Sequence, residues 1–318
     1  MSDRIAFVGH ASTDRVVNLR GERIQPGGAA LYAAMGARTI YDEISLITAV
    51  GADYQYHELL SSFGNSIVRK TKGKGTEFHI TYDRDWNAKY RRASIGPGSR
   101  ITTRDVLGAL SRGARAIHLA PMNPPKVVRM VNAIKDADSG VLVSVNSVIH
   151  YMDTKANRDA ILDAASSADI FILNERELHA LTGDEVVSKA IKAIAARNLV
   201  LTLGEIGTVI RSESGTEFIP AMAAITKNVV DVTGAGDTWS GSFIASYYKT
   251  RSWIKAVSFA HVVSAIKCQG WNFEKIRGLR FGGVEEIIEL AVALKEKGRQ
   301  LTLSDAMRSL ERSGRAAV

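Results

Sequence analysis

The stretch from Val229 to Thr238 carries the strongest signal for chemistry in this sequence. An apolar segment there meets Gly234–Ala235–Gly236, and Asp237 and a helical pattern that runs to Tyr248 follow at once. The free N–H groups and the dipole of a helix's first turn attract anions. Glycines in addition let a phosphate come close to the backbone. The pattern therefore predicts an anion-binding site at the start of this helix.

Asp237 is unexpected in such a site, because a carboxylate repels an anion bound beside it. The arrangement makes chemical sense if Asp237 takes the proton of an attacking hydroxyl group. The N–H groups of Gly234, Ala235 and Gly236 would then stabilise the charge on a transferring phosphoryl group. The alternative is that Asp237 is a favourable first-turn acid on an ordinary helix.

Two further polar clusters follow predicted strands. Asn174–Glu177 comes directly after the apolar run 170–173, at a strand end where open α/β sheets bind ligands. Its oxygen atoms suit Mg²⁺ held through water, although a charged helix N-terminus is the alternative. Thr202–Gly207 is a glycine turn that could hold a nucleotide phosphate or could be a turn only.

The N-terminal region offers Asp14 and the pair Gly27–Gly28. An aspartate can accept hydrogen bonds from neighbouring hydroxyl groups, and two glycines let a ring lie against the backbone. Taken singly, each is also compatible with a turn or a helix cap.

Several other site types are excluded by the sequence. It contains no Gly-x-x-x-x-Gly-Lys-Ser/Thr loop, and the stretch 234–241 lacks the third glycine of a dinucleotide fingerprint. The seven histidines have no metal-ligand spacing, and the single Cys268 rules out both a zinc cluster and a disulfide framework. No Gly-x-Ser-x-Gly nucleophile motif occurs.

Short apolar runs alternate with helical patterns along most of the chain, which predicts an α/β fold with a doubly wound, mostly parallel sheet flanked by helices. The runs lack strict alternation, as is typical of strands covered on both faces. The predicted strands are 4–9, 44–50, 116–120, 141–145, 170–173 and 199–203. The predicted helices are 29–39, 125–137, 155–165 and 184–197, besides the one that follows the glycine turn.

Two stretches depart from this alternation. Residues 77–83 and 89–94 read as an antiparallel hairpin, and 16–24 as another. Hairpins inside a parallel fold indicate a small projecting sheet, which needs something to cover on its apolar face. We expect this sheet to be either a lid over a site, formed by about residues 14–25 and 76–96, or a dimer interface.

Composition and charge limit the class of protein. The 318 residues are 46% hydrophobic and 23% charged, which is typical of a globular protein with a real core. We expect one domain over 1–318, with extra C-terminal helices in 284–318. The apolar run near the start is too short for a signal peptide, and no run could cross a bilayer, so we expect a cytoplasmic protein without a membrane partner. The net charge of +8 is spread over the chain, which argues against nucleic-acid binding.

The four clusters, in this order, resemble the PfkB (ribokinase-like) family of carbohydrate and nucleoside kinases. The resemblance runs from about Arg4 to Asn272, and its most specific part is Asp231–Thr238, which is similar to the family's Asp-Thr-x-Gly-Ala-Gly-Asp signature. Pro26–Gly28 resembles the family's di-glycine signature. Asn174 with Glu177 resembles its Asn-x-x-Glu motif, and 202–207 its nucleotide-side turn.

The resemblance implies roles for these residues. Asp237 would be the general base toward the γ-phosphoryl group of ATP, with Gly234, Ala235 and Gly236 as the anion hole. Asn174 and Glu177 would organise Mg²⁺ and its water. The implied ATP-binding residues are Asn174, Thr202, Gly204, Glu205, Gly207 and Asn272. The implied acceptor site consists of Asp14, Gly27 and Gly28, covered by the hairpins as a lid that excludes water, and lid strands often pair in a homodimer in this family.

Three further positions concern ions and the acceptor. Some family members bind a monovalent cation near the signature, and Asp231 and Thr233 match part of that site, so K⁺ is a candidate cofactor. Tyr32 stands where sugar kinases of the family usually carry an asparagine, and Asn146 with Ser147 replaces an acidic residue. Both differences from the family pattern lie in the part of the site that would bind the acceptor.

These features predict an ATP-dependent kinase that phosphorylates a hydroxyl of a small polyol, either a sugar or an inositol. A nucleoside kinase is the alternative within the family, because Tyr32 could stack on a base. A hypothesis from another class is a non-catalytic nucleotide- or nucleic-acid-binding protein on the kinase fold. A pure binder, however, has no need for a base that faces its anion site.

Overall fold

The predicted apolar runs form one large sheet. In the computed structural model, which describes residues 3–221 and 229–287, its nine strands hydrogen-bond in the order β13-β12-β11-β10-β9-β8-β1-β4-β5. In chain order they are β1 (Arg4–Val8), β4 (Ile44–Val50), β5 (Ile67–Lys70), β8 (Ala114–Leu119), β9 (Leu142–Asn146), β10 (Ile170–Asn174), β11 (Leu199–Thr202), β12 (Gly207–Ser212) and β13 (Gly215–Pro220).

The strands from β11 to β5 run parallel, and only β12 and β13 add antiparallel pairs at one edge. All seven residues of β4 are buried, as are the last four of β1, because helices cover both faces of the sheet. The parallel arrangement brings the carboxyl ends of these strands to the same edge. Asn146, Asn174 and Thr202, each the last residue of its strand, therefore lie at that edge.

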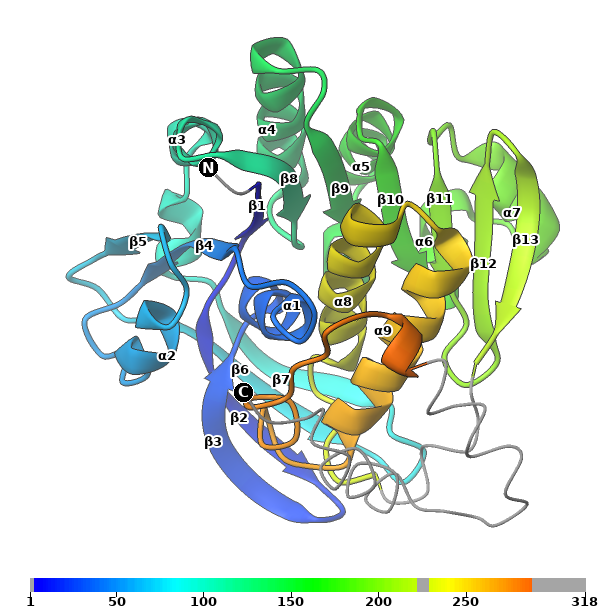
Figure 1. Ribbon diagram of the computed structural model, residues 1–318. Coiled ribbons are helices and arrows are strands. Elements are labelled where there is room, and N and C mark those ends of the chain that lie inside the picture. Colours follow the sequence, from blue (N-terminus) through cyan, green and yellow to red (C-terminus); the bar gives the residue numbers. More distant parts are fainter. Residues whose placement is uncertain (1–2, 222–228, 288–318) are drawn as a thin grey trace.

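Two layers of helices cover the sheet (Figure 1). On one face, α1 (Ala29–Ala37), α8 (Ala235–Thr250), α9 (Trp253–Cys268) and the short α2 (His57–Ser61) build one apolar cluster. On the other face, a second cluster includes α3 (Thr103–Ser111), α4 (Pro124–Ala137), α5 (Lys155–Ser167), α6 (Glu175–Thr182) and α7 (Val187–Ala193).

Small residues bring α1 and α8 into close contact. A Cβ atom added to Gly241 would lie 1.8 Å from the backbone oxygen of Ala33, and one on Gly36 would lie 2.4 Å from the backbone oxygen of Thr238. Neither position therefore has room for a side chain. The contact sets Thr238, in the first turn of α8, against Gly36 in the last turn of α1. Gly28, which precedes α1, and Gly234, which precedes α8, both line the same cavity.

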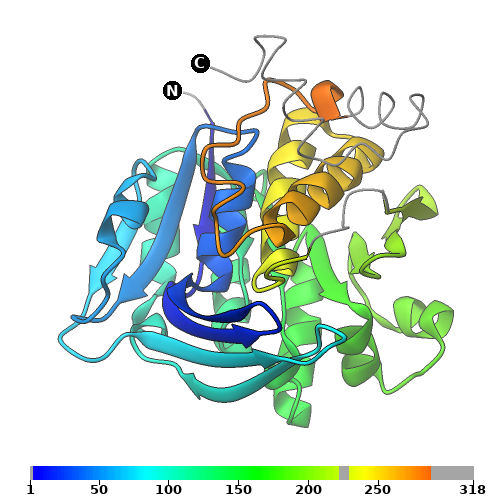
Figure 2. The ribbon, with the colours of Figure 1, turned by 90° about the horizontal axis from the view of Figure 1, so that it is seen from below.

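A separate small sheet lies at the carboxyl edge of the large one (Figures 1 and 2). Its strand order is β3-β2-β6-β7, and the strands are β2 (Ser12–Asn18), β3 (Gly21–Gly27), β6 (Thr76–Tyr82) and β7 (Ala88–Ser94). β2–β3 and β6–β7 are the two predicted antiparallel hairpins, and β2 pairs in parallel with β6. The predicted fold class, a doubly wound and mostly parallel sheet with a small additional sheet, is thus confirmed.

Some elements differ from the prediction. The helix expected over 184–197 is confined to α7, and α3, α9, β5, β12 and β13 were not predicted individually. β5 and β13 have mostly half-exposed or exposed residues and therefore lack the apolar run of a central strand. The expected C-terminal helices lie outside the described residues except for the stretch up to Ile287. Within residues 3–221 and 229–287, none of the helices combines the length and hydropathy needed to cross a bilayer.

Candidate active site

A cavity of about 890 Å³ lies between the carboxyl edge of the large sheet and the small sheet. Its walls come from segments that are distant in the sequence: the strands of the small sheet, the ends of β9, β10 and β11, and the loop that leads into α8. The predicted site residues that line it are Asp14, Gly28, Tyr32, Asn146, Asn174, Glu177, Thr202, Thr233, Gly234, Ala235, Gly236 and Asp237.

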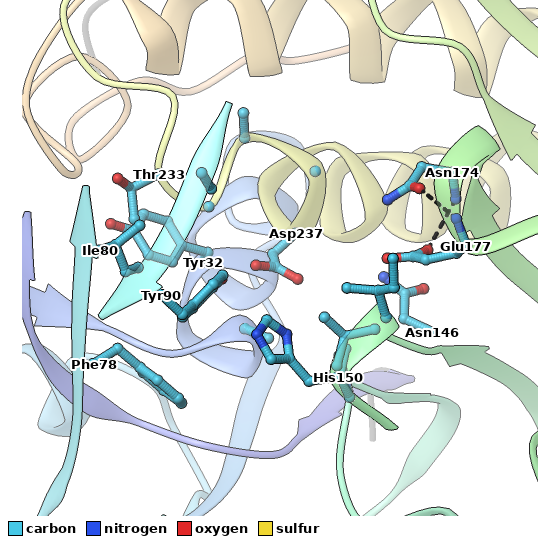
Figure 3. A pocket seen from close by; sticks show the side chains of 18 of the residues that line it. Tyr32, Phe78, Ile80, Tyr90, Asn146, His150, Asn174, Glu177, Thr233 and Asp237 are labelled. Carbon is cyan, nitrogen blue, oxygen red and sulfur yellow. Dashed lines mark hydrogen bonds between the residues drawn. The ribbon is translucent and has the colours of Figure 1, made fainter. Parts of the chain in front are cut away.

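Asp237 lies in the first turn of α8 and lines this cavity. Figure 3 shows its carboxyl group between Ile80 and Tyr90 of the small sheet on one side and Glu177 on the other. Burial raises the pKa of Asp237 to about 6, and attraction by Lys267 opposes part of that rise. Because the pKa of its carboxyl group lies near neutrality, Asp237 is suited to general base chemistry.

The backbone around Asp237 supplies the predicted anion site with one change. The N–H of Ala235 donates to the backbone oxygen of Val232 at 3.0 Å and is already satisfied. The structure gives the N–H groups of Gly234 and Gly236 no backbone acceptor within the described residues. These two N–H groups, rather than all three, are therefore the ones available to an anion.

Gly234 is required where it stands because its φ is +70° and Tyr32 lies directly beneath it. A Cβ atom at this position would come within 2.3 Å of the Tyr32 ring. Tyr32 itself is 1% exposed, and its ring packs against Phe273 with the centroids 4.7 Å apart. The ring thus supports the glycine loop from below, and this packing leaves little of it free to stack on a base.

Asp14 of β2 also lines the cavity and is 2% exposed. Its Oδ1 accepts a hydrogen bond from the Ser12 hydroxyl at 2.6 Å. A Cβ atom on Gly27 would lie 1.9 Å from Oδ2 of Asp14, so only glycine fits behind this carboxylate. Burial, partly opposed by the Ser12 bond, raises the pKa of Asp14 to about 7, and the charges of Asp231 and Asp237 add to the rise.

Asn174 and Glu177 form a capping box at the start of α6. The Asn174 side chain accepts from the Glu177 N–H, and the Glu177 carboxylate accepts from the Asn174 N–H, both at 2.9 Å. The predicted alternative, a helix N-terminus, is therefore also present in the structure. Burial nevertheless raises the pKa of Glu177 to about 8, and the charge of Asp237 contributes.

The chemistry of this side of the cavity fits a divalent cation held through water. Glu177 faces Asp237 across it, and both carboxyl groups have a raised pKa. Asn146 donates to the Ser240 hydroxyl at 2.9 Å, while its own carbonyl oxygen is buried without a partner in the described structure. A positive charge here would reduce the repulsion between the carboxylates of Glu177 and Asp237. Mg²⁺ prefers oxygen ligands, which this side of the cavity offers. Among the described residues, however, no three acidic, histidine or cysteine side chains are grouped so as to bind a metal directly.

The remaining predicted nucleotide-side residues occupy different surroundings. Gly204 and Glu205 lie in the exposed turn between β11 and β12, while Gly207 is buried against β13. Asn272 does not line the cavity: its side chain donates to the Tyr32 hydroxyl at 3.0 Å, and its N–H to Asp231 at 3.1 Å. Asn272 thus belongs to a buried polar cluster beneath the site.

Sequence reasoning missed an aromatic wall on the side of the cavity next to the small sheet. Phe78 of β6, Tyr90 of β7 and His150 of the loop after β9 line it together (Figure 3). The rings of Tyr90 and His150 meet edge to face with centroids 4.6 Å apart, and those of Phe78 and Tyr90 lie 6.0 Å apart. A weak signal was available, because Phe78, Ile80 and Tyr82 alternate along β6 and so share a face.

Comparison with known proteins supports this interpretation of the fold. The profile described as pfkB family carbohydrate kinase matches residues 114–272, which is half of the chain. The cytidine kinase of Thermococcus kodakarensis is 28% identical over 260 residues, covering 78% of this chain and 89% of that protein. A ribokinase of Staphylococcus aureus is 22% identical, covering 85% of this chain and 94% of that protein.

Solved structures of the same fold include a nucleoside kinase of Burkholderia thailandensis in complex with inosine. The TM-score is 0.75 at 18% identity, with 91% of this chain and 99% of that chain covered. A ribokinase of Giardia lamblia gives a TM-score of 0.74, also at 18% identity and with the same coverage. These likenesses concern the fold.

Proposed function

Since the chain belongs to the pfkB family of carbohydrate kinases and is a phosphotransferase, we propose that its acceptor is a nucleoside whose hydroxyl group receives the γ-phosphoryl group of ATP. The observation that carries this proposal is the aromatic wall of Phe78, Tyr90 and His150 in the same cavity as Asp14 and Asp237. A small polyol has no flat apolar surface for such a wall, whereas a nucleobase stacks on aromatic rings. The cytidine kinase and nucleoside kinase among the relatives support the same choice.

In this proposal each group in the cavity has its own task. Asp14 accepts hydrogen bonds from hydroxyls of the sugar ring and so holds the acceptor. Asp237 removes the proton of the attacking hydroxyl, whose oxygen then bonds to phosphorus as the bond to the ADP oxygen breaks. The N–H groups of Gly234 and Gly236 stabilise charge on the phosphoryl group in transfer. The small sheet covers the cavity and excludes water that would otherwise attack ATP.

Glu177, with Asn174 and Asn146 beside it, would hold Mg²⁺ through water on the nucleotide side of the cavity. The ion would supply positive charge to the triphosphate. Thr202 at the end of β11 lines the same side, and we place the nucleotide along it toward Gly204 and Gly207.

The acceptor assignment is tested by a panel of alcohols with coupled detection of ADP. We expect turnover with one or more nucleosides, and at least about tenfold lower kcat/KM with ribose and inositol, which lack a base to stack. Activity confined to sugars or inositol would replace the nucleoside by the polyol that the sequence favoured. Tight polyanion binding with no ADP formed from any alcohol would favour the non-catalytic binding protein instead.

A variant tests the aromatic wall directly. Tyr90→Ala should raise KM for a nucleoside about 5- to 150-fold, because stacking of a base on one aromatic ring contributes about 1–3 kcal/mol. The control is Phe218→Ala, which removes another exposed aromatic ring from β13, away from the cavity. An equal KM in both variants would contradict stacking on Tyr90.

The pKa of Asp237 predicts how activity depends on pH. The base must be deprotonated, so its raised pKa of about 6 means that kcat falls as pH drops through that value, where an ordinary aspartate would remain active. A pH profile of kcat should show this limb. Asp14→Asn serves as a control, because it removes the neighbouring group of pKa about 7. A profile flat from pH 7 down to about 4 would exclude Asp237 as the base.

A further inference from the structure

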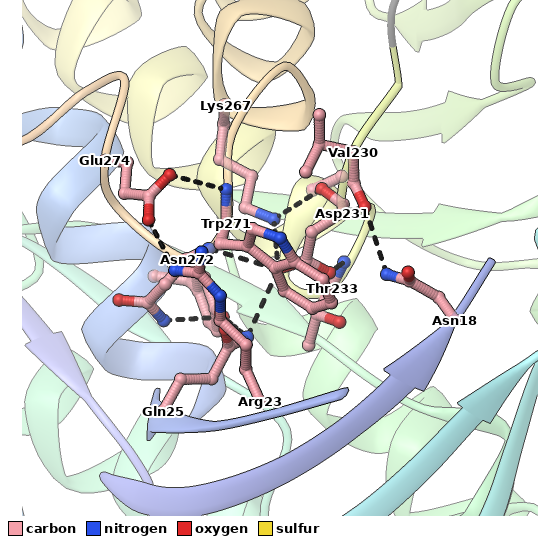
Figure 4. Close-up of polar contacts among 12 residues, drawn as sticks. Asn18, Arg23, Gln25, Val230, Asp231, Thr233, Lys267, Trp271, Asn272 and Glu274 are labelled. Atoms are coloured by element: carbon pink, nitrogen blue, oxygen red, sulfur yellow. Dashed lines mark hydrogen bonds and ion pairs between the residues drawn. The ribbon is translucent and has the colours of Figure 1, made fainter. Parts of the chain in front are cut away.

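A lysine and an aspartate form an ion pair that is entirely shut off from solvent beneath the active site. The Nζ atom of Lys267, near the end of α9, lies 3.4 Å from Oδ2 of Asp231, and both side chains are 0% exposed (Figure 4). Lys267 also donates to the backbone oxygen of Asp231 at 2.8 Å. Charged groups are rarely placed so deep without a role or a partner, since removing them from water is costly.

The carboxylate of Asp231 already has a buried cation and several hydrogen-bond donors around it. Besides Lys267, three N–H donors reach its carboxylate: Thr233 at 2.9 Å, Asn272 at 3.1 Å and Gln25 at 3.2 Å. A carboxylate offers about four acceptor positions, and here four donors reach it, three at Oδ2 and one at Oδ1. Burial acts to raise the pKa of Asp231, but Lys267 and these hydrogen bonds outweigh it and hold the pKa below its usual range. The chemistry of this site therefore does not fit the K⁺ that the family resemblance implied for Asp231 and Thr233.

The pair connects directly to the catalytic loop. Asp231 and Val230 donate their N–H groups to the backbone oxygen of Cys268, so the loop is fixed to the end of α9. The ammonium group also lies over the Tyr32 ring, 5.5 Å from its centroid, and Tyr32 supports Gly234. In addition, the charge of Lys267 reaches Asp237 and moderates the rise in its pKa.

We propose that the ammonium group of Lys267 is the built-in cation of the catalytic loop, so that the enzyme needs no monovalent metal ion for turnover. Lys267 is thus a positioning residue, which holds the loop of the anion site and supplies positive charge beneath it. This inference rests on the proposed kinase function but not on the identity of the acceptor.

The native enzyme gives the first test. With Mg²⁺ and ATP held constant, kcat in potassium chloride and in tetramethylammonium chloride should agree within about twofold. Stimulation by K⁺ of about tenfold or more would overturn the proposal. This comparison needs no variant, so it decides the question even if every substitution at Lys267 prevents folding.

Two variants separate charge from volume. Lys267→Ala leaves an unpaired Asp231 beside an empty space, and kcat in tetramethylammonium chloride should fall about 100-fold, with K⁺ or NH₄⁺ restoring at least a tenth of the lost rate. Lys267→Met fills the space without charge, so added K⁺ should not rescue it. Full activity of either variant without K⁺ or NH₄⁺ would overturn the proposal.

Two readouts exclude a merely structural effect. Potassium should raise the melting temperature of Lys267→Ala relative to tetramethylammonium, and should leave that of the native protein and of Lys267→Met unchanged. The acidic limb of kcat in Lys267→Met should move to higher pH, because Asp237 loses its attracting charge. The melting measurement requires no turnover, so it remains readable if the proposed acceptor is wrong. Potassium stabilisation of the native protein would count against Lys267 as the cation.

Discussion

Asp237→Asn is expected to lower kcat by about 100- to 10,000-fold while ATP binding stays within about threefold of the native value. The amide keeps the size of the carboxylate but cannot take the proton from the attacking hydroxyl. Since the Asp237 side chain lines the cavity and receives no hydrogen bond from a described side chain, its replacement leaves no buried donor unpaired. Single-turnover kinetics and calorimetric titration with ATP measure the two quantities.

Asp159→Asn is a suitable control for this variant. It makes the same chemical change on the exposed face of α5, where Asp159 pairs with Lys155. Native kcat in Asp159→Asn together with the loss in Asp237→Asn would assign the effect to the position. If Asp237→Asn turned over at near the native rate, Asp237 would not be the base.

The second large effect is expected for Gly234→Ala. Its methyl group would overlap the Tyr32 ring at 2.3 Å, and the backbone at φ +70° is unfavourable for alanine. The loop must shift to relieve the overlap, which moves the N–H groups of the anion site. We expect kcat to fall at least about 100-fold, as for the loss of one oxyanion donor, together with a lower melting temperature.

Gly183→Ala separates overlap from backbone strain. Gly183 ends α6 with a φ of +71°, almost the value of Gly234, but no atom lies within 4 Å of its added Cβ. It should therefore lose only about 1–2 kcal/mol of the free energy of unfolding and keep its kcat. Equal stability and full activity of both variants would show that the Tyr32 contact does not constrain the anion site.

Much of the architecture followed from local patterns. Buried parallel strands such as β4 and β10 are short apolar runs, and the two hairpins are pairs of strand-like stretches joined by a polar turn or a glycine, so local patterns identified them. Strands β5 and β13 at the sheet edges were not predicted, because half-exposed strands need no continuous apolar run.

In the site, too, local patterns predicted some features and only the tertiary structure revealed others. Gly234, Gly236, Asp237 and Asn174 were recognisable because the chemistry of a helix N-terminus is encoded within a few consecutive residues. No local pattern predicted that the N–H of Ala235 donates to the backbone oxygen of Val232, because this hydrogen bond depends on the conformation of the loop.

What the sequence by itself determined is therefore the alternation of buried strands and helices, the kinase signature and the candidate base. The tertiary structure alone decided which distant side chains share the cavity: Phe78 and Tyr90 with His150, and Lys267 with Asp231. The physical reason is that hydrophobic periodicity and first-turn chemistry act between near neighbours in the chain. Stacking walls and buried ion pairs, by contrast, arise between residues that only the packing of the two sheets and of α9 brings together.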